Sequence, residues 1–243
     1  MFSGRTGIII AALVAATAAC GTGSEVTRTE PHLPTHGSTE LETLARRFAP
    51  VLRLHADEPY GIADVVAVFH PSRPLIGYHV FFVNDVVRPH DGERFDHEIV
   101  WVEYDAVSLK VADVSTYWHR TVLRTRACIA EAQSSSQRPI VDVQWGQHGM
   151  LPLGWEALRT TRPHLELRLN YSMVHRSERS VFPTHESPVV FDGTYDDYVR
   201  FTEPVELAGF VDRNSVAVAG RPQDVLEGRI AAVFARKKNW PYQ

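Results

Sequence analysis

The sequence predicts a mainly β protein, an antiparallel β-sandwich with a short helix near its N-terminus and a longer one near its C-terminus. Apolar and polar residues alternate with a period of two in much of residues 51–174, most clearly over 141–145 and 165–173. Residues 78–83 and 99–104 are apolar on both faces, as in central strands that are covered on each side. Helical spacing of apolar residues occurs only near the two ends of the domain, so two packed layers of sheet are expected between them.

The first 19 residues have the pattern of a signal peptide. Arg5 precedes a short apolar run over residues 8–16, and small residues follow as far as Cys20. The run is shorter than the about 20 residues that cross a bilayer as a helix. Residues 17–20, Thr-Ala-Ala-Cys, resemble a bacterial lipobox, which implies that Cys20 is acylated, for example with palmitate, and becomes the first residue of the mature protein. The alternative is a plain secretory signal peptide that is cut near Ala19.

A flexible tether is predicted to follow the lipidated Cys20. Residues 20–38 are rich in Gly, Thr, Ser, Pro, Glu and His and have almost nothing to bury. Residues 39–243 then form a single β-sandwich domain. The protein is therefore expected in the cell envelope, outside the cytoplasm and held to a membrane by its lipid.

Helix signals mark both ends of the predicted domain. Thr39 and Glu42 form a capping box, and apolar residues recur at helical spacing until Pro50 ends the helix. The second predicted helix runs over about residues 222–238, with Pro222 in its first turn. Its apolar stripe is expected to dock on the domain, and the basic residues at its end suit the helix dipole.

Charge and cysteine content exclude several classes of protein. The chain has 25 Lys and Arg residues against 29 Asp and Glu residues, a formal net charge of −4, which gives no basic surface for nucleic acid. The two cysteines, Cys20 and Cys128, are too few for a disulfide scaffold or a four-cysteine zinc site. We expect Cys128 to be a buried, inert thiol.

Common hydrolase motifs are missing from the sequence. Position 101 is Trp, so His97 and Glu98 do not begin a helical zinc-protease motif. The sequence contains no Gly-x-Ser-x-Gly elbow and no glycine-rich loop that ends in Gly-Lys-Ser or Gly-Lys-Thr.

The most informative polar segment is residues 93–98, Glu-Arg-Phe-Asp-His-Glu, at the start of a predicted central strand. In an extended strand Asp96 and Glu98 point to one face and His97 to the other. Two carboxylates on one face can share a divalent cation such as calcium or magnesium. The simpler alternative is a solvated strand end that pairs with Arg94.

Other polar groups are candidates for the same site. His148 lies between two glycines, which let the backbone approach a ligand closely, so it is either a ligand or proton carrier or a turn residue bonded to backbone. His79 is expected to be a core histidine, and residues 55–60 are expected to organise a loop. Further candidates are two oxygen donors at a strand end, Asn84 and Asp85, and three tryptophans expected in the core, Trp101, Trp145 and Trp155.

Three segments carry a resemblance to known families. Residues 48–60 resemble the opening of the vacuolar-sorting-associated family of fungi and plants, where an aromatic-Ala-Pro start leads to a His, an acid pair and a Tyr. Residues 93–98 resemble the His-Arg-His-Asp-Trp-Glu signature of its relatives, the necrosis- and ethylene-inducing proteins, and residues 148–152 resemble their later His-Gly and Pro segment. Phe95 stands where that signature has a metal-binding His, and His97 stands where it has Trp.

The resemblance implies a β-sandwich with a divalent-cation site in which Asp96 and Glu98 are ligands. His97 would join them if a bulge turned it onto their face. One hypothesis is a surface recognition module that binds a glycan or a lipid head group, as the necrosis-inducing relatives bind sphingolipid head groups. The alternative is a metal-assisted hydrolase of an extracytoplasmic substrate, in which His148 or His97 transfers protons. The hypotheses differ in whether a proton carrier meets the carboxylate pair in one pocket, and the sequence leaves open whether the protein is an enzyme.

Overall fold

The computed structural model describes residues 39–87, 96–134, 136–159, 163–176, 189–226, 228–229, 237 and 239–241. The predicted signal peptide, Cys20 and the tether lie outside the described residues, as do residues 93–95 of the polar segment. No helix within these ranges is long and apolar enough to span a bilayer.

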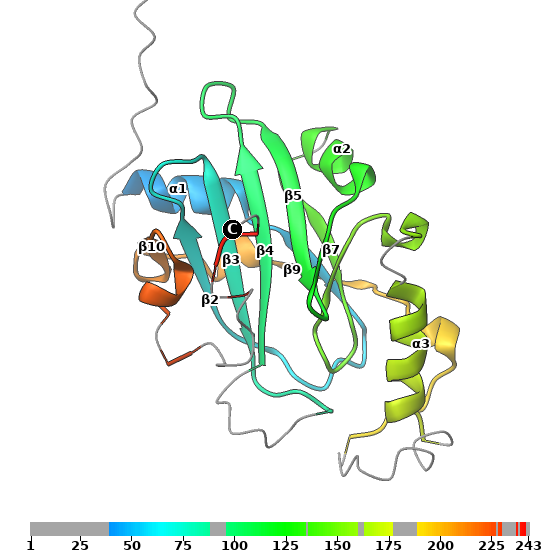
Figure 1. Cartoon of the computed structure of the whole chain (residues 1–243). Coiled ribbons are helices and arrows are strands. Elements are labelled where there is room, and N and C mark those ends of the chain that lie inside the picture. The colour runs from blue at the N-terminus through cyan, green and yellow to red at the C-terminus, as the bar shows by residue number, and fades with distance from the viewer. Residues whose placement is uncertain are drawn as a thin grey trace, which may run out of the picture. The chain divides into compact units, whose positions relative to one another are not determined.

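Two β-sheets form the domain (Figure 1), as the sequence predicts. The six-stranded sheet has the order β10-β2-β3-β4-β5-β6, and the four-stranded sheet has the order β8-β7-β1-β9. Both sheets are mixed, because β1 runs parallel to β7 and β10 runs parallel to β2. The strands are β1 (Val51–Leu54), β2 (Ile62–Phe69), β3 (Leu75–Phe82), β4 (Asp96–Tyr104), β5 (Val111–Trp118), β6 (Thr121–Leu123), β7 (Ile140–Val143), β8 (Met150–Pro152), β9 (Glu203–Glu206) and β10 (Val216–Val218).

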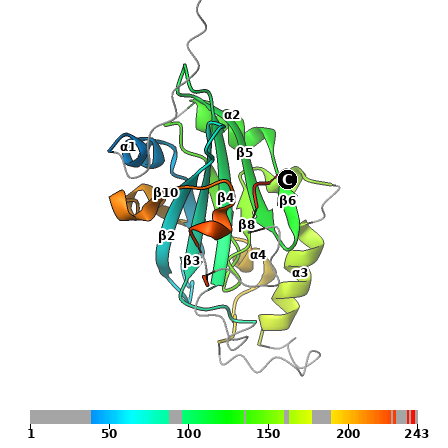
Figure 2. The same ribbon diagram turned by 60° about the vertical axis from the view of Figure 1, so that its left-hand side comes forward.

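Helices lie at the sides of the sheets. In both views α1 lies beside β10, and α3 lies on the side of the sheets opposite to α1 (Figure 1 and Figure 2). The predicted N-terminal helix is confirmed, and it buries Leu41, Ala45 and Phe48 at helical spacing. The α-helices are α1 (Thr39–Phe48), α2 (Arg126–Ser134), α3 (Pro163–Val174) and α4 (Tyr195–Tyr198), and short 3-10 turns cover Trp155–Ala157, Leu207–Gly209, Arg213–Ser215 and Pro222–Asp224.

The main hydrophobic core lies between the two sheets. We call the face of the six-stranded sheet that meets this core its inner face, and the opposite face its outer face. All eight residues of β3 are buried, which confirms the predicted central strand. Its residues Tyr78, Val80 and Phe82 belong to the inner face. The outer face has a smaller core, in which Phe81 and Trp101 pack with Trp240 from the C-terminal segment.

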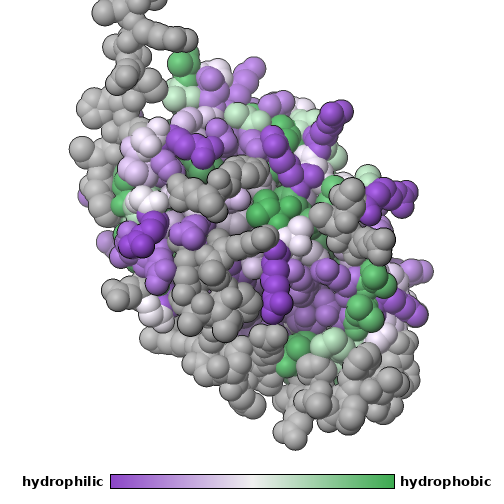
Figure 3. Space-filling view, in the orientation of Figure 1, coloured by the Kyte–Doolittle hydropathy of each residue, from purple (hydrophilic) through white to green (hydrophobic). Residues whose placement is uncertain are grey.

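The strand predicted over residues 165–173 is wrong, because this segment belongs to helix α3. Its buried residues are Pro163, Leu167, Tyr171 and Val174, at a helical spacing. The apolar residues between them do not share that face. Leu165 is 53% exposed, and Figure 3 shows apolar side chains at the surface over α3. The alternation therefore came from one buried stripe and one exposed stripe of the same helix.

Only part of the predicted C-terminal helix, over about residues 222–238, lies among the described residues. Its described beginning is a 3-10 turn at Pro222–Asp224, and Val225 and Leu226 after it are not helical. Residues 227, 230–236 and 238 lie outside the described part of the chain. The strand predicted over 141–145 also ends early, because β7 stops at Val143 and the chain turns there.

Candidate functional site

The site lies where the turn between β7 and β8 meets the ends of β3 and β4. His148 belongs to this turn and has a left-handed backbone with a φ of 54°. The next residue must be glycine, because a Cβ at Gly149 would lie 2.6 Å from the side chain of Trp118. The turn closes on itself, since the Gln144 backbone N–H donates to Gly149 O at 3.1 Å. The chain therefore turns here, and the side chain of His148 points into the molecule.

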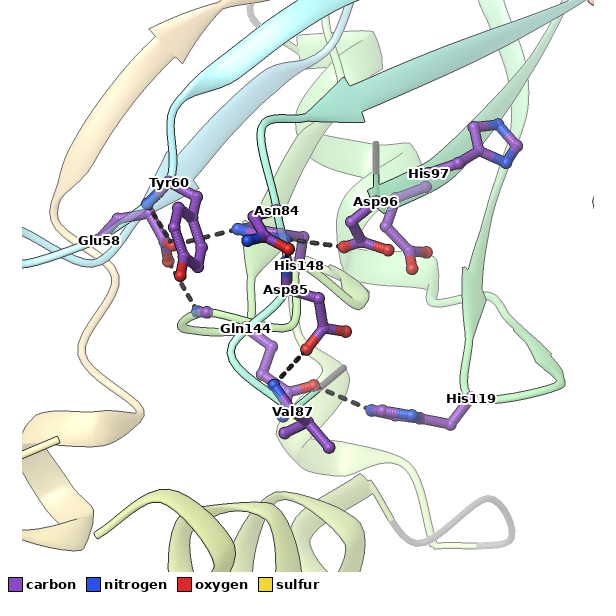
Figure 4. Close-up of polar contacts among 12 residues, drawn as sticks. Glu58, Tyr60, Asn84, Asp85, Val87, Asp96, His97, His119, Gln144 and His148 are labelled. Atoms are coloured by element: carbon purple, nitrogen blue, oxygen red, sulfur yellow. Dashed lines mark hydrogen bonds and ion pairs between the residues drawn. The ribbon is translucent and has the colours of Figure 1, made fainter. Parts of the chain in front are cut away.

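Two carboxylates hold the imidazole of His148 from opposite sides (Figure 4). Its Nδ1 lies 2.8 Å from Asp96 Oδ2, and its Nε2 lies 3.1 Å from Glu58 Oε1. The ring is fully buried and stacks on Phe82 with 3.8 Å between the ring centroids. Burial lowers the pKa of His148, but the hydrogen bonds and charges of Asp96 and Glu58 outweigh it and raise the pKa to about 10. The group is therefore an imidazolium at neutral pH, donating from both nitrogens.

Glu58 joins this turn to the loop that follows β1. Its Oε2 accepts a hydrogen bond from the Gly146 backbone N–H at 2.9 Å, and its Oε1 accepts one from the Tyr60 N–H at 3.3 Å. The carboxylate is thus satisfied by two loops and by His148. Glu58 is expected from the sequence to organise a loop, and the acid pair after the first strand is the signal that points to its part in the site.

The predicted carboxylate pair is present on β4. Asp96 pairs with Phe82 in the sheet ladder, and the pairing of β4 with β3 shows no bulge through Glu103. Asp96 and Glu98 therefore share the inner face, as the pleat predicts. The Asp96 side chain is 13% exposed and its contact with His148 uses one oxygen. Among the described residues the other oxygen, Oδ1, has no hydrogen-bond partner.

Glu98 is bound to the C-terminal segment. Lys237 Nζ donates to Glu98 Oε1 at 2.8 Å and also to the His97 carbonyl oxygen. The other oxygen, Glu98 Oε2, is buried without a hydrogen-bond partner in the described structure. Burial raises the pKa of Glu98 to about 8, although the Lys237 charge works in the opposite direction. No local sequence signal places Lys237 here, because the helical spacing predicts it at the end of a helix.

His97 lies on the outer face, away from the carboxylate pair. Its Nε2 lies 2.9 Å from Nδ1 of His79, and its ring stacks on Phe81. Burial lowers the pKa of His97 well below its ordinary value and lowers that of His79 to about 3. Both imidazoles are therefore neutral at physiological pH. His79 is a core residue, as expected.

Most of the remaining candidate residues form turns, hydrogen-bond networks or the core. Asp85 Oδ1 caps the Val87 backbone N–H at 2.5 Å. Gln144 connects the site to two residues that the sequence did not single out, since its side chain bonds His119 Nε2 and Tyr198 Oη, both at 2.9 Å. The three tryptophans expected in the core are buried there, Trp101, Trp145 and Trp155. Cys128 is also buried, which raises the pKa of its thiol to about 12.

The donor set for a cation is small. Within the described ranges, no group of three or more His, Cys, Asp and Glu side chains is placed to hold a metal ion. Asp96 and Glu98 each keep one carboxylate oxygen without a described partner, and that of Glu98 is buried. To hold magnesium or calcium, these two oxygens would have to be joined by water or ligand oxygens.

Comparison with known proteins gives one structural neighbour to describe. No protein-family model matches the chain, and no curated protein matches it. A solved structure, NLPPya in complex with glucosamine, matches with a TM-score of 0.35 and 17% identity. That neighbour is a necrosis- and ethylene-inducing-like protein. The match covers 44% of this chain and 65% of that chain, so it spans less than two thirds of the neighbour's length. A score this low transfers no residue role to the present chain.

Proposed function

We propose that the protein is an exported, lipid-anchored recognition module that binds a glycan or a lipid head group at the cell surface. A divalent cation held by Asp96 and Glu98 would bind the oxygen atoms of this glycan or head group. The observation that carries the proposal is the buried Oε2 of Glu98, which has no described partner. Two residues earlier on the same face of β4, Asp96 Oδ1 also has no described partner. A buried carboxyl oxygen without a partner costs on the order of 1–3 kcal/mol, and a cation that displaces the proton of Glu98 would remove that cost.

The two carboxylates are held in place before any ligand arrives. His148 fixes Asp96 from within the domain, and Lys237 fixes Glu98. Such preorganisation lowers the entropic cost of binding. When bound, calcium or magnesium would supply a centre that accepts oxygen donors, such as sugar hydroxyls or a phosphate. The nearby Lys237 charge opposes a second cation, so the affinity is expected to be weak, about 0.1–1 mM as in extracellular calcium modules.

The histidine contacts favour recognition over hydrolysis. A general base needs an accessible nitrogen within reach of the reacting group. His148 uses both of its nitrogens on carboxylates and is fully buried. His97 lies on the opposite face of β4, bonded to His79. Neither imidazole therefore has an unpaired, accessible nitrogen on the inner face that could act as a base.

Cation-dependent binding tests this proposal. The purified protein would be applied to a glycan array and to vesicles with and without glycolipid, in calcium, in magnesium and with a chelator. We expect binding to a glycan or a glycolipid that the chelator removes. Asp96→Asn and Glu98→Gln should lose it, while Glu103→Gln, a more exposed acid of the same strand, should keep it. Binding that persists at full strength in chelator, or in both site variants, would contradict the cation-dependent site.

A further inference from the structure

The loop that sends Glu58 to His148 also lines a separate pocket. This pocket has a volume of about 660 Å³, and the loop contributes His55, Asp57 and Pro59 to it. The other wall comes from residues 189–193, just before α4, and from Arg200 after α4. Neither Asp96 nor Glu98 lines it. A pocket of this size accommodates a small organic molecule.

Much of the pocket wall is apolar and aromatic. Trp145 and Phe191 are 2% and 4% exposed, and their ring centroids are 5.1 Å apart at an angle of 68°. His55 also meets the Phe191 ring, with 5.3 Å between the centroids. Val189, Val190 and Pro59 complete this wall. A ligand would therefore need an apolar part to gain binding free energy from contact with this wall.

Most charges around the pocket compensate one another. Asp192 is bound by Arg176 through both of its carboxylate oxygens. Asp197 is bound by Arg200 at 3.1 Å and by the Thr194 cap. Asp57 differs, because among the described residues its carboxylate has no hydrogen bond and no ion pair. The described lining thus has one uncompensated charge, and it is negative.

Buried side chains fix the position of Asp57. Its backbone N–H donates to His55 Nδ1 at 2.9 Å, and its carbonyl oxygen accepts from Trp145 Nε1 at 2.9 Å. Because His55 Nδ1 accepts, its Nε2 carries the proton and donates to the Asp197 carbonyl oxygen at 3.1 Å. His55 and Trp145 are both more than nine-tenths buried. The backbone of Asp57 is therefore held on both sides, while the residue itself is exposed at the pocket.

We propose that this pocket binds a small organic cation, an alkylammonium or guanidinium group on an apolar body, with Asp57 as its counter-ion. A carboxylate forms charge-assisted hydrogen bonds with such groups, and aromatic rings attract them. The single free carboxylate suits one monovalent cation, whereas a divalent metal needs several oxygen ligands. The uncompensated negative charge of Asp57 would repel an anion. The proposal does not depend on the cation site at Asp96 and Glu98.

The same chemistry occurs in free amines and in basic side chains of peptides. Titration calorimetry on the purified protein would therefore compare butylammonium, a capped lysine peptide and neutral butanol. We expect both cations to bind and butanol not to bind. Tighter binding of the peptide would identify a protein partner, and tighter binding of the free amine would identify a small metabolite. Either result supports the pocket as a site for organic cations.

Asp57→Asn is the decisive variant, because it keeps the shape of an exposed side chain and removes its charge. It should weaken binding of the cations at least about tenfold, the usual scale for losing a charged hydrogen bond. Asp224→Asn removes one carboxylate from an exposed pair with Arg221 and should leave binding unchanged. An unchanged melting temperature of Asp57→Asn would show that the fold is kept. No binding of either cation to the wild type, or equal binding to Asp57→Asn, would overturn the proposal.

Discussion

His148 Nδ1 lies 2.8 Å from Asp96 Oδ2, and this contact joins the β7–β8 turn of one sheet to the first residue of β4 in the other. Glu58 on the opposite side of the ring adds the loop after β1. Three segments of the sandwich thus meet on one buried imidazolium. The geometry makes His148 a positioning residue for Asp96, while Lys237 holds Glu98.

Removing this imidazolium should strongly destabilise the protein. His148→Ala leaves Glu58 and Asp96 without their shared cation, and breaking a buried charge pair in this way costs about 3–5 kcal/mol. The free energy of unfolding, measured by urea denaturation, should fall by about that amount. His164→Ala, which changes an exposed histidine on α3, should cost less than about 1 kcal/mol. Equal stabilities for the two variants would show that His148 does not hold the loops together.

Acid should destabilise the fold through the outer-face histidine pair. Burial lowers the pKa of His79 from 6.5 to about 3. Between these two pH values, His79 binds a proton in the unfolded chain but not in the folded chain. The contribution of His79 to the free energy of unfolding is then full above pH 6.5 and falls by about 1.4 kcal/mol per pH unit below it. Glu98, whose pKa is raised to about 8, contributes in the opposite direction between pH 8 and 4.5. His148 does not offset this loss, because its raised pKa gives a contribution that is already complete below 6.5 and is lost only toward pH 10.

His79→Gln provides the matched comparison for this pH dependence. Glutamine keeps a polar side chain at the position but does not titrate. The free energy of unfolding of the variant should therefore fall less steeply between pH 6.5 and 4 than that of the wild type. Parallel curves for the two proteins would mean that His79 is not held neutral by its surroundings.

The proposed lipid anchor makes membrane attachment depend on Cys20. Cys20→Ser would remove the thiol that the proposed lipid is attached to. The variant should move from the membrane fraction to the aqueous fraction when cells are fractionated. Equal amounts of wild type and Cys20→Ser in the membrane fraction would rule out the lipid anchor.

Local sequence signals predicted the elements whose burial follows one simple pattern. β3 and β4 were predicted because apolar residues occupy both of their faces, and α1 was predicted from its helical spacing. The helix α3 was missed because its exposed Leu165 and Leu169 fill the gaps between buried positions and imitate a strand. Only tertiary contacts distinguish the two stripes, since the burial of each depends on what packs against it.

The candidate site was predictable only within one strand. The pleat places Asp96 and Glu98 on one face, and two glycines mark the turn of His148. Their partners could not be read from spacing, because His148 lies 52 residues from Asp96 and 90 residues from Glu58 in the chain. The Lys237 contact with Glu98 spans 139 residues. Such pairings are set by how the sheets and loops pack.

The melting temperature of the purified protein with added calcium or magnesium, and again with a chelator, tests the central claim most directly. A cation that binds only the folded state raises the melting temperature by mass action. We predict a rise with cation that the chelator reverses, and no rise in Asp96→Asn or Glu98→Gln, while Glu103→Gln responds like the wild type. A wild-type melting temperature that is indifferent to both cation and chelator would contradict the site, and the two carboxylates would then serve only as partners of His148 and Lys237.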